Sequence, residues 1–217
     1  MVFPIESEDR TLRNLLMLCQ DNARLVVEAY RKSLILFDHL TKGKPIGGVD
    51  PLADIHKAID DSNRVKTSTM KELSEIGGIL VSRDDFLRLS SSFSGMMDSI
   101  EVITMRLVEV KAREWKLSKS QAEGIGNMSD LGFDALVKLR DSIMSLGFNS
   151  EKAASYDKDI DEIEKKLDLL NIQVDLDIVT SKRDIAYILI LRDVARELER
   201  LGDKVREASD LVRILAL

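Results

Sequence analysis

Glycine, proline and cysteine are scarce in this sequence. Its 217 residues include 11 Gly, 3 Pro and 1 Cys. So little glycine and proline, roughly half of average usage, favours long helices. A lone cysteine, Cys19, excludes both a disulfide framework and a cluster of thiolate metal ligands. We expect Cys19 to be a buried helical residue.

The chain also lacks an excess of positive charge. It has 32 Lys and Arg against 38 Asp and Glu, a net charge of −6. Because nucleic-acid backbones are bound mainly by clustered Lys and Arg, we expect no nucleic-acid partner. The first residues, MVFPIESEDR, do not follow the signal-peptide pattern. The densest apolar run, residues 186–191, is far shorter than the roughly 20 residues that span a bilayer, so a cytoplasmic protein is expected.

Apolar residues recur along most of the chain at alternating spacings of three and four. Such heptad patterns run through residues 12–40, 86–110 and 191–215, and they are typical of long helices packed on other helices. A second helix is predicted at about residues 51–76 and a fifth from about residue 150. Because no segment shows a convincing strand-like alternation of apolar and polar residues, the predicted class is all-α.

Glycines and capping patterns predict where these helices begin and end. The glycines of residues 43–48 predict a loop, and Gly77-Gly78 would end the second helix. Several glycines between residues 124 and 132 indicate an irregular connection, so the fourth helix is expected only from about residue 134 to residue 146. Ser82-x-x-Asp85 and Ser181-x-x-Asp184 resemble each other as caps that would open the third and sixth helices.

The second half of the chain echoes the first. If Phe93 and Leu198 are given the same heptad position, Ser94 and Asp98 fall at the positions of Glu199 and Asp203. Two three-helix units arranged as a repeat are therefore the economical architecture. We predict one domain over residues 1–217, with repeat one at about residues 5–117 and repeat two at about residues 118–217.

Residues 196–205, RELERLGDKV, combine two features that are unfavourable in a helix. Gly202 interrupts the apolar pattern, and a glycine inside a helix costs about 1 kcal/mol relative to alanine. Glu199 and Asp203 lie four residues apart on one face, where like charges repel by a few tenths of a kcal/mol. The carboxylates are either simply solvated or bound to something positive. Gly202 would let a partner helix approach closely, and this packing role holds with or without a ligand.

Residues 198–203, LERLGD, resemble the LERIGD signature of PhoU proteins, the negative regulators of bacterial phosphate uptake. The cap at Ser82 and the pattern after it are similar to the shorter PhoU-like proteins encoded beside low-affinity Pit phosphate transporters, and the N-terminal FPIE and the long helix after it also fit. This resemblance covers nearly the whole chain. It implies an all-α, six-helix bundle made of two three-helix PhoU-like repeats, each carrying E(D)-x-x-x-D motifs that hold surface metal clusters.

Carried over residue by residue, the resemblance implies one metal site. Glu199 and Asp203 match the motif in full, and Asp157 and Asp161 match it on the partner helix. In the first half, the motif on the third helix has become Ser94-x-x-x-Asp98.

The motif positions of the second helix in that half hold no strong ligand. They are Ile59 and Asn63, although Asp60 and Asp61 lie alongside. The second-half site is therefore expected to be kept and the first to be lost or weakened. Clustered carboxylates suit hard cations and oxygen-bound iron or manganese. Iron, manganese, zinc or magnesium are the expected candidates.

The resemblance implies a non-enzymatic regulator or adaptor of inorganic phosphate transport. Its expected partner is a phosphate transporter or its regulatory apparatus, with membrane contact only through that partner, and the heptad seams make a homo-oligomer plausible. Two alternatives remain open. A metal-free scaffold would need only Arg200, Lys204 and Arg206 to neutralise the acidic face. A carboxylate-bridged metalloenzyme would need an open coordination position and a general base, and no sequence feature supplies the base.

Overall fold

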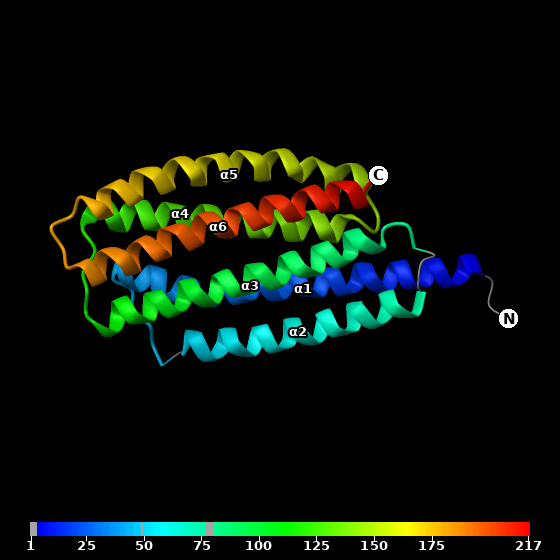
Figure 1. Cartoon of the computed structure of the whole chain (residues 1–217), viewed down its shortest axis with the longest axis horizontal. Helices are drawn as coiled ribbons and strands as arrows, with labels where there is room; N and C mark the ends of the chain where they lie inside the picture. Colours follow the sequence, from blue (N-terminus) through cyan, green and yellow to red (C-terminus); the bar gives the residue numbers. More distant parts are fainter. Residues whose placement is uncertain (1–3, 49, 77–79) are drawn as a thin grey trace.

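The computed structural model describes residues 4–48, 50–76 and 80–217, with side chains described from residue 10 onward. Within these ranges the chain forms six α-helices that run up and down one long axis (Figure 1). They are α1 (Pro4–Lys42), α2 (Pro51–Ile76), α3 (Arg83–Ala112), α4 (Lys119–Ser145), α5 (Ser150–Val179) and α6 (Ile185–Leu215). The predicted all-α class is confirmed.

The helices form a bundle with α2 and α5 at opposite edges (Figure 1). Among the described residues, α2 packs on α1 and α3, whereas α5 packs on α4 and α6. The two halves meet where α1 lies against α4 and α3 lies against α6. Each half therefore contributes two inner helices and one outer helix. The exact division into repeats at residue 117 stays a prediction.

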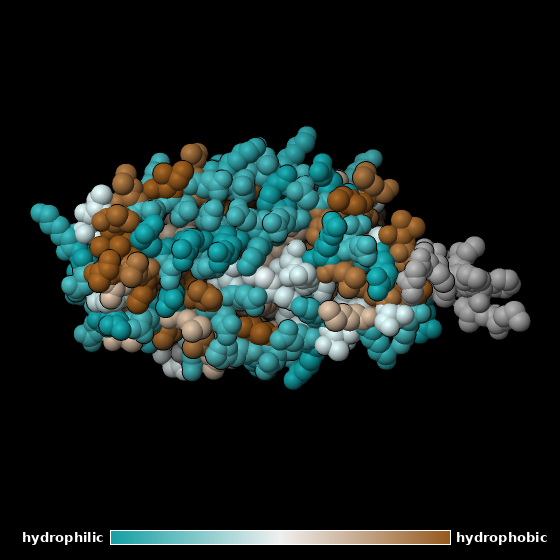
Figure 2. Space-filling view, in the orientation of Figure 1, coloured by the Kyte–Doolittle hydropathy of each residue, from teal (hydrophilic) through white to brown (hydrophobic). Residues whose placement is uncertain are grey.

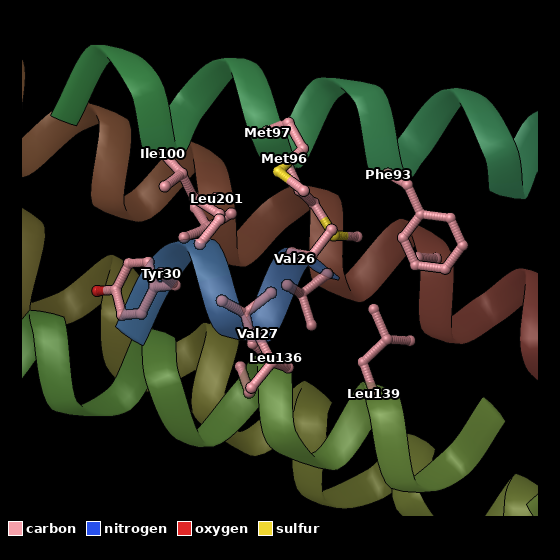
Figure 3. Close-up of a cluster of buried hydrophobic side chains, with 14 of the residues drawn as sticks. Val26, Val27, Tyr30, Phe93, Met96, Met97, Ile100, Leu136, Leu139 and Leu201 are labelled. Atoms are coloured by element: carbon pink, nitrogen blue, oxygen red, sulfur yellow. The ribbon is translucent and has the colours of Figure 1, made fainter. Parts of the chain in front are cut away.

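The core lies where the inner helices of the two halves meet. Figure 3 shows side chains from α1, α3, α4 and α6 converging there. Tyr30, Met96 and Leu201 are almost completely buried, as the heptad pattern predicts. Cys19 is also buried in α1, and burial raises the pKa of its thiol to about 12. This confirms the expectation that Cys19 is a buried helical residue.

Helix α4 is much longer than predicted. It begins at Lys119, where the Ser118 hydroxyl accepts a hydrogen bond from the backbone N–H of Gln121, and the Gln121 side chain accepts one from the backbone N–H of Ser118. This capping box starts the helix well before residue 134. The glycines that suggested a loop lie inside the helix. A Cβ on Gly124 would lie 2.5 Å from Val174 of α5, so that glycine allows close helix packing instead of ending a helix.

The two caps that looked alike in sequence differ in structure. Ser82 does precede α3, but its side chain makes no capping hydrogen bond. Helix α6 begins later than predicted, after Asp184, and the Ser181 hydroxyl donates to the carbonyl oxygen of Ile178 at the end of α5. Ser181 therefore terminates α5 and does not open α6. The predicted loop at residues 43–48 is confirmed, while Gly77-Gly78 lies outside the described residues.

The buried residues of α3 and α6 follow one pattern over about six turns. Phe86, Leu89, Phe93, Met96, Ile100, Ile103 and Leu107 of α3 correspond in order to Leu191, Val194, Leu198, Leu201, Val205, Ala208 and Val212 of α6. The outer helices match in the same way. Ile55, Ser62, Thr69 and Ile76 of α2 correspond to Ala153, Ile160, Leu167 and Val174 of α5. The two halves can therefore be compared position by position.

The surface is hydrophilic over the middle of the bundle and more hydrophobic towards its ends (Figure 2). Near the turn between α5 and α6, exposed apolar side chains include Leu176, Val179, Ile185 and Leu189. None of the helices in the described ranges has an apolar stretch that could span a bilayer.

Candidate metal site between α5 and α6

A cluster of carboxylates lies between α5 and α6. One oxygen from each of Glu164, Asp168 and Asp203 can be chosen so that all three lie within 4.8 Å of one another. Among the described residues, this is the one group of three or more potential metal ligands that meets that spacing. Glu199 lies one turn before Asp203 on α6, and its charge interacts with those of Asp203, Asp168 and Glu164.

Helix geometry explains why carboxylates from α5 and α6 gather here. Glu164 and Asp168 are four residues apart on α5, as Glu199 and Asp203 are on α6, so each pair projects from one face of its helix. Between the pairs, Leu167 of α5 packs against Gly202 of α6, where a Cβ would lie 2.6 Å from the leucine Cδ1. The glycine lets the two helices approach closely at this level. The role expected for Gly202 in helix approach is confirmed.

The cluster carries negative charge that the nearby Arg200 and Arg206 offset only in part. Burial raises the pKa of Glu164, and the neighbouring charges of Asp168 and Asp203 raise it further. Glu199 and Asp203 also have raised pKa values, mainly through burial and then through nearby carboxylates that include Asp168. Each shift means that the negative form is disfavoured in the folded protein. A bound cation would relieve both the desolvation and the mutual repulsion.

The basic residues next to the cluster are directed elsewhere. The Arg200 guanidinium pairs with Glu197 at 2.8 Å. Lys204 donates to the carbonyl oxygen of Gly95 at 2.7 Å and to the Ser99 hydroxyl at 2.9 Å, which draws its ammonium towards α3. In the described part of the chain, none of the four clustered carboxylates forms an ion pair with a lysine or arginine.

Arg206 also binds other carboxylates. It pairs with Asp157 at 3.0 Å, with Asp161 at 3.3 Å and with Asp210 at 2.9 Å. Together with Arg200 and Lys204, it is one of the residues expected to neutralise the acidic face in a metal-free scaffold. All three bind other groups instead. The structure therefore weakens the case for neutralisation by side chains.

The structure does not bring Asp157 and Asp161 into the cluster. Asp157 accepts hydrogen bonds from Arg206 and from the Ser209 hydroxyl, each at 3.0 Å. Asp161 is bound by Lys165 at 2.6 Å, and this hydrogen bond lowers the pKa of its carboxyl group. These two side chains already have positive partners. On α5 the structure places Glu164 and Asp168, and not Asp157 and Asp161, next to Asp203. Metal binding by Asp157 and Asp161 stays a prediction.

Glu164 and Asp168 lie one heptad after the pair chosen from the sequence, about 10 Å further along the helix axis. Spacing within a helix fixes the face but repeats every heptad, so it does not fix the axial register between two helices. The turn does not settle the register either. In an antiparallel hairpin, residues at equal distance from the turn face each other, and counting outwards from residues 181–184 places residue 162, between Asp161 and Glu164, opposite Asp203.

The donor set fits a hard metal ion. Glu164, Asp168 and Asp203 bring carboxylate oxygens within 4.8 Å of one another, and Glu199 lies one turn from Asp203 on α6. Such oxygen-rich sites suit magnesium, calcium, manganese and iron. Zinc in proteins more often takes nitrogen or sulfur ligands, and neither is part of this group. Of the four expected candidates, zinc is therefore the least suited. Metal binding by Glu164, Asp168, Glu199 and Asp203 is a proposal.

The position in the first half has a different composition. The Lys66 ammonium of α2 donates to the Ser94 hydroxyl of α3 at 3.1 Å. Asp98 lies one turn after Ser94 and is exposed. The sequence predicts Ile59 and Asn63 opposite Ser94 and Asp98. In the structure Lys66 contacts Ser94, one heptad after Ile59.

The sequence matches no protein-family model and no curated protein sequence. Solved structures with the same fold include a PhoU-like phosphate regulatory protein from Shewanella oneidensis MR-1, which is 16% identical, with a TM-score of 0.76 over 93% of this chain and 98% of that chain. PhoU from Pseudomonas aeruginosa is 15% identical, with a TM-score of 0.76 over 95% and 97%.

The phosphate transport system regulatory protein PhoU from Streptococcus pneumoniae is 16% identical, with a TM-score of 0.74 over 95% of both chains. The chain therefore has the PhoU-like fold over nearly its whole length. The predicted six-helix PhoU-like architecture is confirmed. The narrower relation to Pit-associated proteins stays a prediction.

Proposed function

We propose that this protein is a non-enzymatic regulator of inorganic phosphate transport. The observation that carries the proposal is the fold, which matches PhoU and PhoU-like phosphate regulatory proteins over 93–95% of this chain. The LERLGD segment at residues 198–203 adds a sequence feature to the same proposal. A helical bundle can act in this way without catalysing a reaction. It would act by docking on a transporter or on that transporter's regulatory apparatus.

The carboxylate cluster gives this regulator a means of responding to a metal ion. A cation held by Glu164 and Asp168 of α5 and by Glu199 and Asp203 of α6 would fasten the outer helix to an inner one. Without the cation, repulsion among the four groups would loosen that contact. Metal occupancy would thereby set the shape of the surface formed by α5 and α6. The metal supplies charge compensation here, and the chain's own residues supply the ligands.

The proposal is tested by measuring phosphate uptake in the native organism after the gene is deleted. We expect uptake or its response to phosphate supply to change, and a plasmid copy of the wild type to restore it. A copy carrying Glu164→Gln and Asp203→Asn should restore it less well at equal protein level. Unchanged uptake across several phosphate concentrations would contradict the proposed function.

The two alternatives are separated by measurements on the purified protein. A scaffold without metal would show near-zero metal content when prepared without an affinity tag, and no change on removing the carboxylates. A metalloenzyme would turn over a phosphate ester such as p-nitrophenyl phosphate when loaded with metal, and it would lose that turnover in Asp203→Asn. The regulator is expected to bind metal without such turnover.

A further inference from the structure

The first half of the bundle has a counterpart of the carboxylate cluster that has changed its charge. The matching buried positions of the two halves place Lys66 of α2 where α5 has Glu164, and Met70 where α5 has Asp168. On the inner helices, Ser94 stands where α6 has Glu199, and Asp98 where α6 has Asp203. Only Asp98 keeps a carboxylate.

The contact between Lys66 and Ser94 supports this correspondence independently of the pattern. Its donor and acceptor are 3.1 Å apart and join α2 to α3. In the second half, the equivalent positions are Glu164 and Glu199, and a Glu164 oxygen lies within 4.8 Å of one of Asp203 across α5 and α6. The same position between an outer and an inner helix therefore holds different groups in the two halves. In the first half it holds a lysine bound to a hydroxyl, and in the second half it holds carboxylates.

The charges of the two positions differ sharply. The second-half set, Glu164, Asp168, Glu199 and Asp203, is wholly acidic. In the first-half set the positive charge of Lys66 balances the negative charge of Asp98, while Ser94 and Met70 are neutral. Serine and methionine are poor ligands for a hard cation. An ammonium at this position also repels any cation that approaches.

We propose that Lys66 is a built-in cation that takes the place of a metal between α2 and α3, so that this chain binds metal in its second half alone. This inference rests on the proposed function and specifies how many metal ions the chain binds and where it binds them. The ammonium of Lys66, which is part of the chain and cannot dissociate, then joins α2 to α3 permanently. Only the α5–α6 pair responds to the metal supply. The bundle is thus an asymmetric sensor, with one fixed edge and one edge that depends on metal.

The test is a manganese titration followed by the electron paramagnetic resonance signal of free Mn²⁺. The wild type is expected to bind one equivalent at the α5–α6 position. A variant with Lys66→Glu, Met70→Asp and Ser94→Glu recreates the second-half set, because Asp98 is already present, and it should bind one equivalent more. A control with Lys57→Glu, Thr67→Asp and Ser91→Glu makes the same charge change at exposed positions of the same helices and should leave the stoichiometry unchanged.

Two results would overturn the inference while leaving the proposed function intact. One is a wild type that binds an additional equivalent which Ser94→Ala with Asp98→Ala removes. The other is a folded triple variant that gains no equivalent. The Ser94→Ala, Asp98→Ala variant does not depend on the triple variant folding.

A wild type that binds no manganese would count against the metal part of the proposed function. The triple variant alone then tests the role of Lys66. Binding of one Mn²⁺ equivalent would support Lys66 as the group that excludes metal, and binding of no Mn²⁺ would overturn the inference.

Discussion

Leu167 of α5 lies directly over Gly202 of α6, with its Cδ1 atom 2.6 Å from the point that a Cβ on residue 202 would occupy. Both residues are buried, so neither side has free space into which to move. This contact sets the separation of α5 and α6 beside Asp168 and Asp203. Gly202 and the acidic pair Glu199 and Asp203 are each unfavourable in an isolated helix. Both are explained by the close approach of α5 and α6, which gathers the carboxylates.

Gly202→Ala should destabilise the protein by about 1–2 kcal/mol, because overpacking against Leu167 outweighs the better helix propensity of alanine. Chemical denaturation measures this free energy directly. Gly126→Ala on α4 is the matched control, since the nearest atoms to its Cβ would be those of Thr41 at 3.9 Å. That variant should gain up to about 1 kcal/mol. Equal stabilisation of both variants would show that Gly202 does not set the helix separation.

Asp203→Asn should stabilise the metal-free protein at pH 7 by a few tenths of a kcal/mol, because it removes a like-charge neighbour of Glu199. The raised pKa of Asp203 means that the folded state holds the proton more tightly than the unfolded state. Wild-type stability therefore falls as the pH rises from the ordinary carboxyl range through the folded-state pKa. The advantage of the asparagine variant should accordingly shrink on acidification and vanish near pH 4.

Denaturation curves in the presence of a chelator, at several pH values, measure this difference. Asp157→Asn is the matched control, because Asp157 accepts hydrogen bonds from Arg206 and Ser209. It should lose stability at pH 7, where Asp203→Asn gains it. A loss of stability for Asp203→Asn without metal would contradict the repulsion described for the cluster.

The sequence predicted the all-α class, the long helices and the acidic face of α6 correctly, because these depend on spacing within one helix. Asp157 and Asp161 show where that reasoning stops. They share a helix face with Glu164 and Asp168, and their segment resembles the family's motif. Neither the shared face nor the resemblance fixes the axial register of α5 against α6, which the packing of Leu167 on Gly202 shows in the structure. The same slip of one heptad separated Ile59 and Asn63 from Lys66 and Met70.

Helix α4 shows a second kind of failure. Glycines between residues 124 and 132 suggest a loop, but Gly124 and Gly132 make close contacts with Val174 and Tyr30 inside the helix. Such contacts join residues that are distant in the sequence, and no local pattern reveals them. The capping box of Ser118 and Gln121 was the local signal that could have placed the start of this helix.

Arg206→Met should destabilise the protein by about 1–3 kcal/mol, because the carboxylates of Asp157 and Asp161 lose a partly buried partner. Thermal or chemical denaturation provides the measurement. Arg64→Met is the control, since its pairing with Asp61 is largely exposed and should contribute less than about 1 kcal/mol. If the two substitutions had the same effect, Arg206 would not be joining α5 to α6.

Gln121→Leu should cost about 1–3 kcal/mol, because its side-chain oxygen accepts hydrogen bonds from the Tyr187 hydroxyl at 2.6 Å and from the backbone of Ser118. Adding Tyr187→Phe should then cost less than it does in the wild type, since the hydroxyl has already lost its acceptor. A double-mutant cycle by chemical denaturation measures this coupling. Strict additivity would mean that the bond between the two side chains does not stabilise the fold.

The central claim is that a metal ion joins α5 to α6 through Glu164, Asp168, Glu199 and Asp203. The most direct measurement compares the Mn²⁺ dissociation constants of two double variants of α5, Glu164→Gln with Asp168→Asn and Asp157→Asn with Asp161→Asn. The account predicts that the first variant binds at least about tenfold more weakly than the wild type, a loss of about 1.4 kcal/mol or more. The second, although less stable, should keep the wild-type affinity. Wild-type affinity in the first variant and loss in the second would contradict the account.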